Sequence, residues 1–302
     1  MVSRKMGAMI KRILAALVMI PIAVITLYVG SPYVEVLAVM VGGLLAWEWA
    51  NMLSSPQKAS HYVTAYMITL AVSIWGYNFS LIIPIICIVS LLVYVLAEKE
   101  KYRKLLTLGV PYISIGIASL IWIYRSFDPS EGNFDPRYNY SFVMTMWFFL
   151  MVWSMDIGGL VVGCNLKGPK LAPKISPNKT WSGLCGGMLL AMSVSIIYMY
   201  FWTKIMDVPF YDFTHFRYIS FSYKTLQIHR HWNIDGQMFY AVLAMIIALI
   251  SQIGDLIESA IKRRVGVKDS SKLIPGHGGV FDRIDGLIFA APLVYLFFIY
   301  IL

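Results

Sequence analysis

Apolar stretches of about 20 residues recur along this chain, and they constrain its fold more than any other feature of the sequence. A helix of that length crosses the roughly 30 Å hydrocarbon core of a bilayer, whereas barrel strands would need alternating segments of about ten residues. Of the 302 residues, 59% are hydrophobic and only 14% are charged, which excludes an ordinary water-soluble globule. The sparse charge and the lack of a fixed repeat also exclude disordered and fibrous classes.

We therefore predict an all-α, polytopic integral membrane protein with about nine transmembrane helices. The expected spans are 13–30, 34–53, 62–78, 80–97, 105–124, 141–163, 184–203, 238–257 and 286–302. Basic residues before the first span would also suit a signal peptide. Its long apolar run, with Pro32 where a small-residue cleavage site would be expected, favours a retained span.

The distribution of cationic residues predicts the orientation of the chain. Of the 25 Lys and Arg residues, 19 fall on one side of the expected bilayer and 6 on the other. This bias places the N-terminus and the basic loops in the cytoplasm and the C-terminus outside. The net charge of +9 is therefore concentrated on one face. Topology together with attraction to anionic lipid headgroups would explain it, and a functional role of this face stays equally open. We expect a multi-pass protein of the cell inner (plasma) membrane.

Carboxylates inside expected spans are costly and are functional candidates by default. Glu48 lies between Trp47 and Trp49, which indicate an interfacial aromatic belt, and we interpret it as structural. Asp156 lies late in the sixth expected span and precedes a run of glycines. Such small residues let helices approach closely, and they also let a ligand reach the backbone, so both readings stay open.

Two loops on the basic side contain charged residues that are candidates for a functional site. The loop over 164–183 holds four lysines and no acidic residue, which suits a polyanion such as a nucleoside triphosphate but also suits an ordinary cytoplasmic loop. The eighth expected span continues without a turn signal into the loop over 258–285. On a continuing helix, Asp255 and Glu258 are i,i+3 neighbours, and Lys262 follows Glu258 at i+4 as a plausible ion-pair partner.

The segment over 251–286 combines five carboxylates and six cationic residues with a glycine-rich turn. The carboxylates are Asp255, Glu258, Asp269, Asp282 and Asp285. Carboxylates together with phosphates are the ligands that Mg²⁺ prefers, and exposed glycine N–H groups can approach an anion. A solvated charged loop would explain the charges but not the dense turn between two acidic pairs. The segment therefore predicts a site for a metal ion and a phosphate.

This segment resembles the signature of the phosphatidate cytidylyltransferase family, also called CDP-diacylglycerol synthases. The matching residues are Ser259, Lys262, Arg263, Lys268, Asp269, Ile274, Pro275, His277, Gly278, Gly279, Asp282, Arg283 and Asp285. Gly254-Asp255-Leu256 and the run from Ser176 to Thr180 resemble two further family elements. The chain departs from the family pattern at Ser182, where an acidic residue is usual, and at Gly159-Leu160, where Ala-Tyr is common.

The resemblance implies an enzyme that condenses CTP with phosphatidic acid, giving CDP-diacylglycerol and pyrophosphate. The N-terminal transmembrane helices would occupy 1–140, and 141–302 would form the catalytic transmembrane region with a site facing the cytoplasm. The implied partners are CTP, phosphatidic acid and the lipid bilayer, without a nucleic acid polymer; a homodimer is left open. The implied cofactor is Mg²⁺ held by Asp255 and Asp282, with a second metal ion left open.

The resemblance also implies roles for individual residues. The expected catalytic residues are Asp255, Lys262, Lys268, Asp269, Asp282 and Arg283. The expected substrate-binding residues are Asp156, Ser176, Lys179, Thr180, Arg263, His277, Gly278, Gly279 and Asp285. No strong general base is needed, because a phosphate monoester is already largely ionised at neutral pH. We therefore assign His277 to phosphate contact or loop structure before proton abstraction.

Other functions remain open from the sequence. Within the enzyme class, the acceptor could be another lipid phosphate, such as an isoprenoid ether lipid. A membrane ion or anion transporter would use Asp156 and Asp255 at broken helices, although no inverted repeat is evident and the charges cluster at one interface. A third reading is an assembly protein whose basic face recruits anionic lipid.

Overall fold

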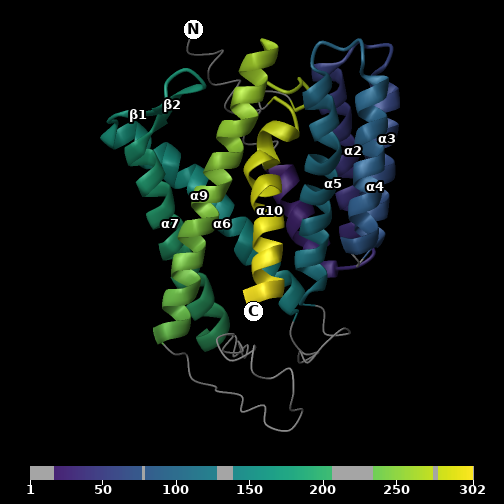
Figure 1. The fold of residues 1–302 in the computed structure, drawn as a ribbon. Helices are drawn as coiled ribbons and strands as arrows, with labels where there is room; N and C mark the ends of the chain where they lie inside the picture. Colours follow the sequence, from purple (N-terminus) through teal and green to yellow (C-terminus); the bar gives the residue numbers. More distant parts are fainter. Residues whose placement is uncertain (1–16, 77–78, 128–138, 206–233, 275–277, 302) are drawn as a thin grey trace.

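The computed structural model describes residues 17–76, 79–127, 139–205, 234–274 and 278–301. These residues form an all-α integral membrane protein with one small β-hairpin in a connection (Figure 1). The helices are an apolar helix over Leu17–Val29, α2 (Tyr33–Leu53), α3 (Ala59–Trp75), α4 (Phe79–Leu96), α5 (Arg103–Arg125), α6 (Tyr140–Leu166), α7 (Trp181–Tyr200), α9 (Ile234–Val265) and α10 (Phe281–Ile301). A π-helical turn, Phe201–Ile205, continues α7.

The predicted class of fold is confirmed. Within the described residues, five helices are long and apolar enough to cross a membrane by length and composition. They are Tyr33–Leu53, Arg103–Arg125, Tyr140–Leu166, Trp181–Thr203 and Gln237–Val265. The helices Leu17–Val29 and Ile82–Leu96 are apolar but shorter, so nine membrane crossings stay a prediction. Residues 13–16, 77–78 and 302 of the expected spans lie outside the described part of the chain.

The helices run alternately up and down, so that four connections gather at one end of the bundle (upper end of Figure 1). These connections are residues 54–58, 97–102 and 167–180, together with the described residues between α9 and α10, 266–274 and 278–280. We call this end the basic end. The connection over 167–180 contains the two-stranded antiparallel hairpin of β1 (Lys170–Ala172) and β2 (Ser176–Thr180). The basic loops of the sequence therefore share one end of the fold.

The core consists of two clusters of buried apolar side chains. One cluster is built mainly from α2, α3, α4 and α5 and includes Leu45, Tyr66 and Ile113. The second is built mainly from α6, α7, α9 and α10 and includes Trp147 and Ala244. Helix α10 contributes to both clusters and stands between α9 and α5 in Figure 1. It therefore joins the two halves of the bundle.

Small residues bring α6 and α7 into close contact. A Cβ atom added to Gly158 of α6 would lie 2.8 Å from the Cα atom of Gly187 and 2.9 Å from the carbonyl oxygen of Gly186. Gly163 meets Gly183 in the same way, at 3.4 Å from its Cα atom. The glycines that follow Asp156 therefore serve helix packing, which is one of the two readings that the sequence left open.

Gly158→Ala tests this packing directly. The added methyl group would meet backbone atoms, which cannot move aside, so we expect the substitution to destabilise the protein by about 1–3 kcal/mol. The thermal unfolding midpoint of the purified protein in detergent measures this effect. Gly43→Ala is the matched control, because its added Cβ would meet only the end of the Met67 side chain, at 3.5 Å. An unfolding midpoint unchanged in Gly158→Ala would contradict the close contact.

Candidate functional site

Two helices cross closely enough to bring their acidic residues together. A Cβ atom added to Gly254 of α9 would lie 2.5 Å from the Cβ atom of Phe289 and 3.2 Å from the carbonyl oxygen of Asp285. A Cβ atom added to Gly286 of α10 would lie 3.0 Å from the carbonyl oxygen of Ser251. Because glycines occupy both faces of this crossing, the first turns of α10 lie directly against the Asp255 region of α9.

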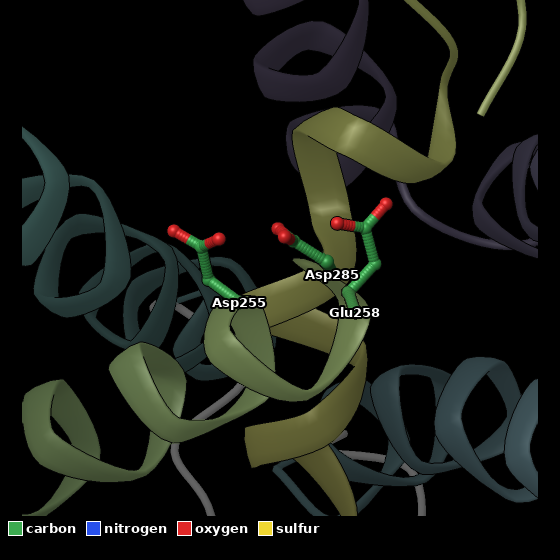
Figure 2. A group of neighbouring side chains, drawn as sticks. All are labelled: Asp255, Glu258 and Asp285. Carbon is green, nitrogen blue, oxygen red and sulfur yellow. The ribbon is translucent and has the colours of Figure 1, made fainter. Parts of the chain in front are cut away.

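Asp255 and Glu258 of α9 meet Asp285 of α10 at this crossing (Figure 2). One oxygen atom from each of these carboxylates lies within 4.8 Å of the others, and we call the three side chains the carboxylate group. Asp255 and Glu258 are on one face of α9 because α9 continues as a helix to Val265, as the sequence predicts. The group lies at the basic end of the bundle, where α10 begins.

The carboxylate group fits a divalent cation. Glu258 is 1% exposed, and its Oε1 atom has no hydrogen-bond partner among the described residues. A buried carboxylate oxygen without a partner is costly, and three neighbouring carboxylates repel one another unless positive charge lies between them. Hard cations such as Mg²⁺ take oxygen ligands of this kind and complete their shell with water and substrate phosphates.

Two lysines supply positive charge to the carboxylates. Lys179 of β2 forms an ion pair with Asp255. Lys262 is buried and lies between two acids, with its Nζ atom 2.5 Å from Glu258 Oε2 and 2.5 Å from Asp282 Oδ1. The i,i+4 pair of Glu258 and Lys262 is the one that the sequence suggests. Lys262 therefore connects the carboxylate group to Asp282.

Asp282 organises the loop that precedes α10. Its carboxylate accepts hydrogen bonds from the backbone N–H of Gly279 at 2.7 Å and from that of Ser270 at 3.0 Å. Gly278 has a φ of +84°, a conformation that glycine adopts without strain, and an added Cβ there would lie 2.4 Å from Asp282 Oδ2. The glycines of the turn therefore let the loop fold tightly around the Asp282 carboxylate.

Glu48 of α2 holds the same loop from the other side. It is 1% exposed, and its carboxylate accepts hydrogen bonds from the backbone N–H of Val280 at 2.9 Å and of Phe281 at 2.8 Å. The hydroxyl groups of Ser270 and Ser271 donate to it at 3.1 and 2.6 Å. The negative charge of Glu48 also stabilises α10, because the N-terminus of a helix carries a partial positive charge. These contacts anchor the loop before α10 to the N-terminal half of the chain.

The hairpin places Lys179 over the carboxylate group. Thr180 ends β2 and caps α7, because its hydroxyl accepts a hydrogen bond from Gly183 N–H at 3.1 Å. On the opposite side, the Nε atom of Arg263 donates to the carbonyl oxygen of Ile175 at 3.3 Å. The two contacts tie the hairpin to α7 and to the end of α9.

The structure brings most of the predicted site residues to one region. Asp156 lies on α6 within electrostatic range of Asp255, Lys179 and Arg283. Lys268 and Asp269 are exposed on the loop after α9. The N–H of Gly279 is engaged by Asp282, while Ser176 begins β2 and lies opposite Ala172. His277 lies outside the described residues.

The resemblance implied Asp255 and Asp282 as metal ligands, whereas the carboxylates that the structure brings close enough to share an ion are Asp255, Glu258 and Asp285. Glu258 is one of the five carboxylates of the segment, but the resemblance gives it no role, and its expected ion pair with Lys262 is a sufficient structural explanation. The spacing of three residues between Asp255 and Glu258 was the signal that could have indicated it, because residues three apart lie on the same face of a helix. The contacts of Glu48 join residues more than 220 positions apart, and no local pattern indicates them.

The fold and the site define a multi-helix membrane protein with a carboxylate and lysine cluster at the basic end of the bundle. The sequence model of the Cytidylyltransferase family matches residues 10–301, so the chain belongs to this family. It is 30% identical to the phosphatidate cytidylyltransferase of Brucella suis biovar 1 (strain 1330) over 95% of this chain and 92% of that protein. The phosphatidate cytidylyltransferase of Haemophilus influenzae is 30% identical over 97% and 99% of the two chains.

Proposed function

We propose that this protein transfers a cytidylyl group from CTP to phosphatidic acid, giving CDP-diacylglycerol and pyrophosphate for phospholipid biosynthesis. The observation that carries the proposal is the meeting of Asp255, Glu258 and Asp285 beside Lys179 at the end of a membrane helix bundle. Membership of the family and the names of the relatives support the reaction and the two substrates. We place this end of the bundle in the cytoplasm, following the bias of Lys and Arg.

Asp255, Glu258 and Asp285 would hold Mg²⁺. When bound, the ion supplies positive charge that lowers the repulsion between two phosphates and stabilises the leaving pyrophosphate. Asp282, the second ligand predicted from the sequence, would act by fixing Lys262 and the loop before α10, since its oxygens accept from Lys262, Ser270 and Gly279. A second metal ion would find its ligands among the substrate phosphates.

The lysines divide into two roles by their surroundings. Lys262 is buried between two carboxylates, so we propose that it neutralises and spaces them. Lys179 is partly exposed on the hairpin, and Lys268 is exposed on the loop, so both can reach phosphates that enter from the aqueous side. Each would donate charge-assisted hydrogen bonds to the nucleotide.

The surrounding helices explain why the site lies in a membrane. Apolar side chains such as Leu160 of α6 and Leu189 and Ile197 of α7 are exposed, and in a bilayer they would face lipid. The acyl chains of phosphatidic acid would stay beside them while the headgroup reaches the basic end. The acceptor phosphate is already ionised at neutral pH, so binding and orientation are the main tasks of the chain.

Lys179→Gln tests the nucleotide contact. We expect KM for CTP to rise about tenfold to a hundredfold, because one hydrogen bond to a charged group contributes about 1.5–3 kcal/mol. Lys174→Gln is the matched control, since Lys174 is an exposed lysine of the same hairpin, and its KM should stay near the wild-type value. Equal effects of the two substitutions would contradict the assignment of Lys179.

The reaction itself is tested with purified protein, radiolabelled CTP, phosphatidic acid and Mg²⁺. We expect the labelled liponucleotide to form only when all three are present. Turnover with an isoprenoid ether lipid phosphate but not with phosphatidic acid would show that the acceptor is the ether lipid. Ion flux into protein-only liposomes without CTP turnover would favour a transporter, which the one-sided clustering of charges in the described residues argues against.

A further inference from the structure

A pocket lies at the basic end, away from the carboxylate group. Its volume is about 530 Å³, and it lies where α4 ends, α5 begins and α9 ends. It is lined by Tyr94, Lys101, Tyr102, Arg103, Lys104, Leu105, Leu108 and Arg264. Four of these eight residues are cationic, and none of them belongs to the proposed reaction site.

The end of α9 presents different residues to the two sites. Lys262 faces Glu258 and Asp282, while Arg264 lines the pocket. Residues two apart on a helix point about 200° away from each other, so they face different sides of α9. The hydroxyl of Tyr102 donates to the carbonyl oxygen of Arg264 at 3.4 Å, which fixes this helix end against the start of α5.

One cationic side chain of the pocket is held in place by Tyr94, and the other three are exposed to solvent. The guanidinium of Arg103 lies 3.4 Å from the ring centroid of Tyr94, and its Nε atom donates to the Tyr94 carbonyl oxygen at 2.6 Å. Lys101, Lys104 and Arg264 are exposed. Helix α5 begins here without a side-chain cap, so its first N–H groups add positive potential. Of the nearby acids, Glu100 is engaged by Lys58 and Ser55, and Glu98 is exposed to solvent.

Apolar surface lies beside the cationic residues of the pocket. Leu108 is 57% exposed, and Val95, next to Tyr94 on α4, is 58% exposed. An occupant therefore needs a negative charge at the water boundary and hydrocarbon below it. A phospholipid with an anionic headgroup has this form, and basic pockets between membrane helices bind such headgroups.

We propose that this pocket binds the headgroup of an anionic phospholipid from the surrounding bilayer, with its acyl chains along α4 and α5. The proposal goes beyond the cytidylyl transfer and does not depend on it.

Native mass spectrometry of the full chain in detergent tests this site. The probes are dioleoyl phosphatidylglycerol, which is anionic, and dioleoyl phosphatidylcholine, which has the same acyl chains and no net charge. We expect wild-type protein to retain phosphatidylglycerol preferentially. In the triple variant Lys101→Gln, Lys104→Gln and Arg264→Gln, affinity for phosphatidylglycerol should fall about tenfold or more.

The matched control removes three exposed lysines of the same end outside the pocket: Lys170→Gln, Lys174→Gln and Lys272→Gln. It should retain phosphatidylglycerol like the wild type. Equal retention of the two lipids by wild-type protein, or equal losses in the two triple variants, would overturn the proposal. Displacement of phosphatidylglycerol by millimolar inorganic phosphate would also overturn it, because the pocket would then bind soluble anions. An unchanged unfolding midpoint shows that the pocket variant is folded.

Discussion

Asp285→Asn is expected to lower the formation of CDP-diacylglycerol by about a thousandfold or more, because one charged ligand would leave the carboxylate group. The substitution conserves size and leaves the α9–α10 crossing intact. Asp255→Asn should have a similar effect, and the double variant should lose little more, since residues that act as a unit are not additive. Initial rates with purified variants at saturating CTP and Mg²⁺ measure the effect.

Glu98→Gln is the matched control for these variants, because Glu98 is an exposed carboxylate at the same end of the bundle. It should keep wild-type activity. All variants should be recovered from the membrane with unchanged unfolding midpoints. Full activity of both Asp255→Asn and Asp285→Asn would show that the carboxylate group plays no part in the reaction.

Glu48→Ala is expected to destabilise the protein by about 3–5 kcal/mol, because it leaves buried donors without their charged acceptor. The affected donors are the backbone N–H groups of Val280 and Phe281 and the hydroxyls of Ser270 and Ser271. Activity should fall as well, since the loop before α10 also folds around the Asp282 carboxylate. Thermal unfolding in detergent and initial rates measure the two effects.

Glu98→Ala controls for the loss of an acidic residue at this end and should leave the unfolding midpoint unchanged. The same midpoint in Glu48→Ala and Glu98→Ala would contradict the anchoring role of Glu48. If Glu48→Ala lost activity without any loss of stability, Glu48 would instead belong to the reaction site.

The helices of this fold could be predicted from the sequence because a membrane span is identified by the length and hydropathy of its apolar stretch. The continuation of α9 past its apolar part also followed, since no turn signal precedes Gly266, where the helix ends. The glycines after Asp156 suited either close helix packing or the approach of a ligand to the backbone, and the structure packs them against the glycines of α7. The small hairpin over Lys170–Thr180 had no clear signal beyond its proline and glycine content.

The choice among the carboxylates could not be predicted, because it depends on how α9 crosses α10. Spacing shows that Asp282 and Asp285 are both near the start of the last helix, but they point to different neighbours. Asp285 meets Asp255 and Glu258, while Asp282 turns toward Lys262 and the loop. The resemblance supplied Asp255 and Asp282 as ligands, and only the geometry of the crossing indicates Glu258 and Asp285.

The most direct test of a metal held between the last two helices is anomalous diffraction from crystals soaked in Mn²⁺ and CTP. Mn²⁺ takes the same oxygen ligands as Mg²⁺ and marks its own position. We predict an anomalous peak at coordination distance, about 2–2.5 Å, from carboxylate oxygens of both Asp255 and Asp285. A strong peak bound elsewhere, with none between these two helices, would contradict the account.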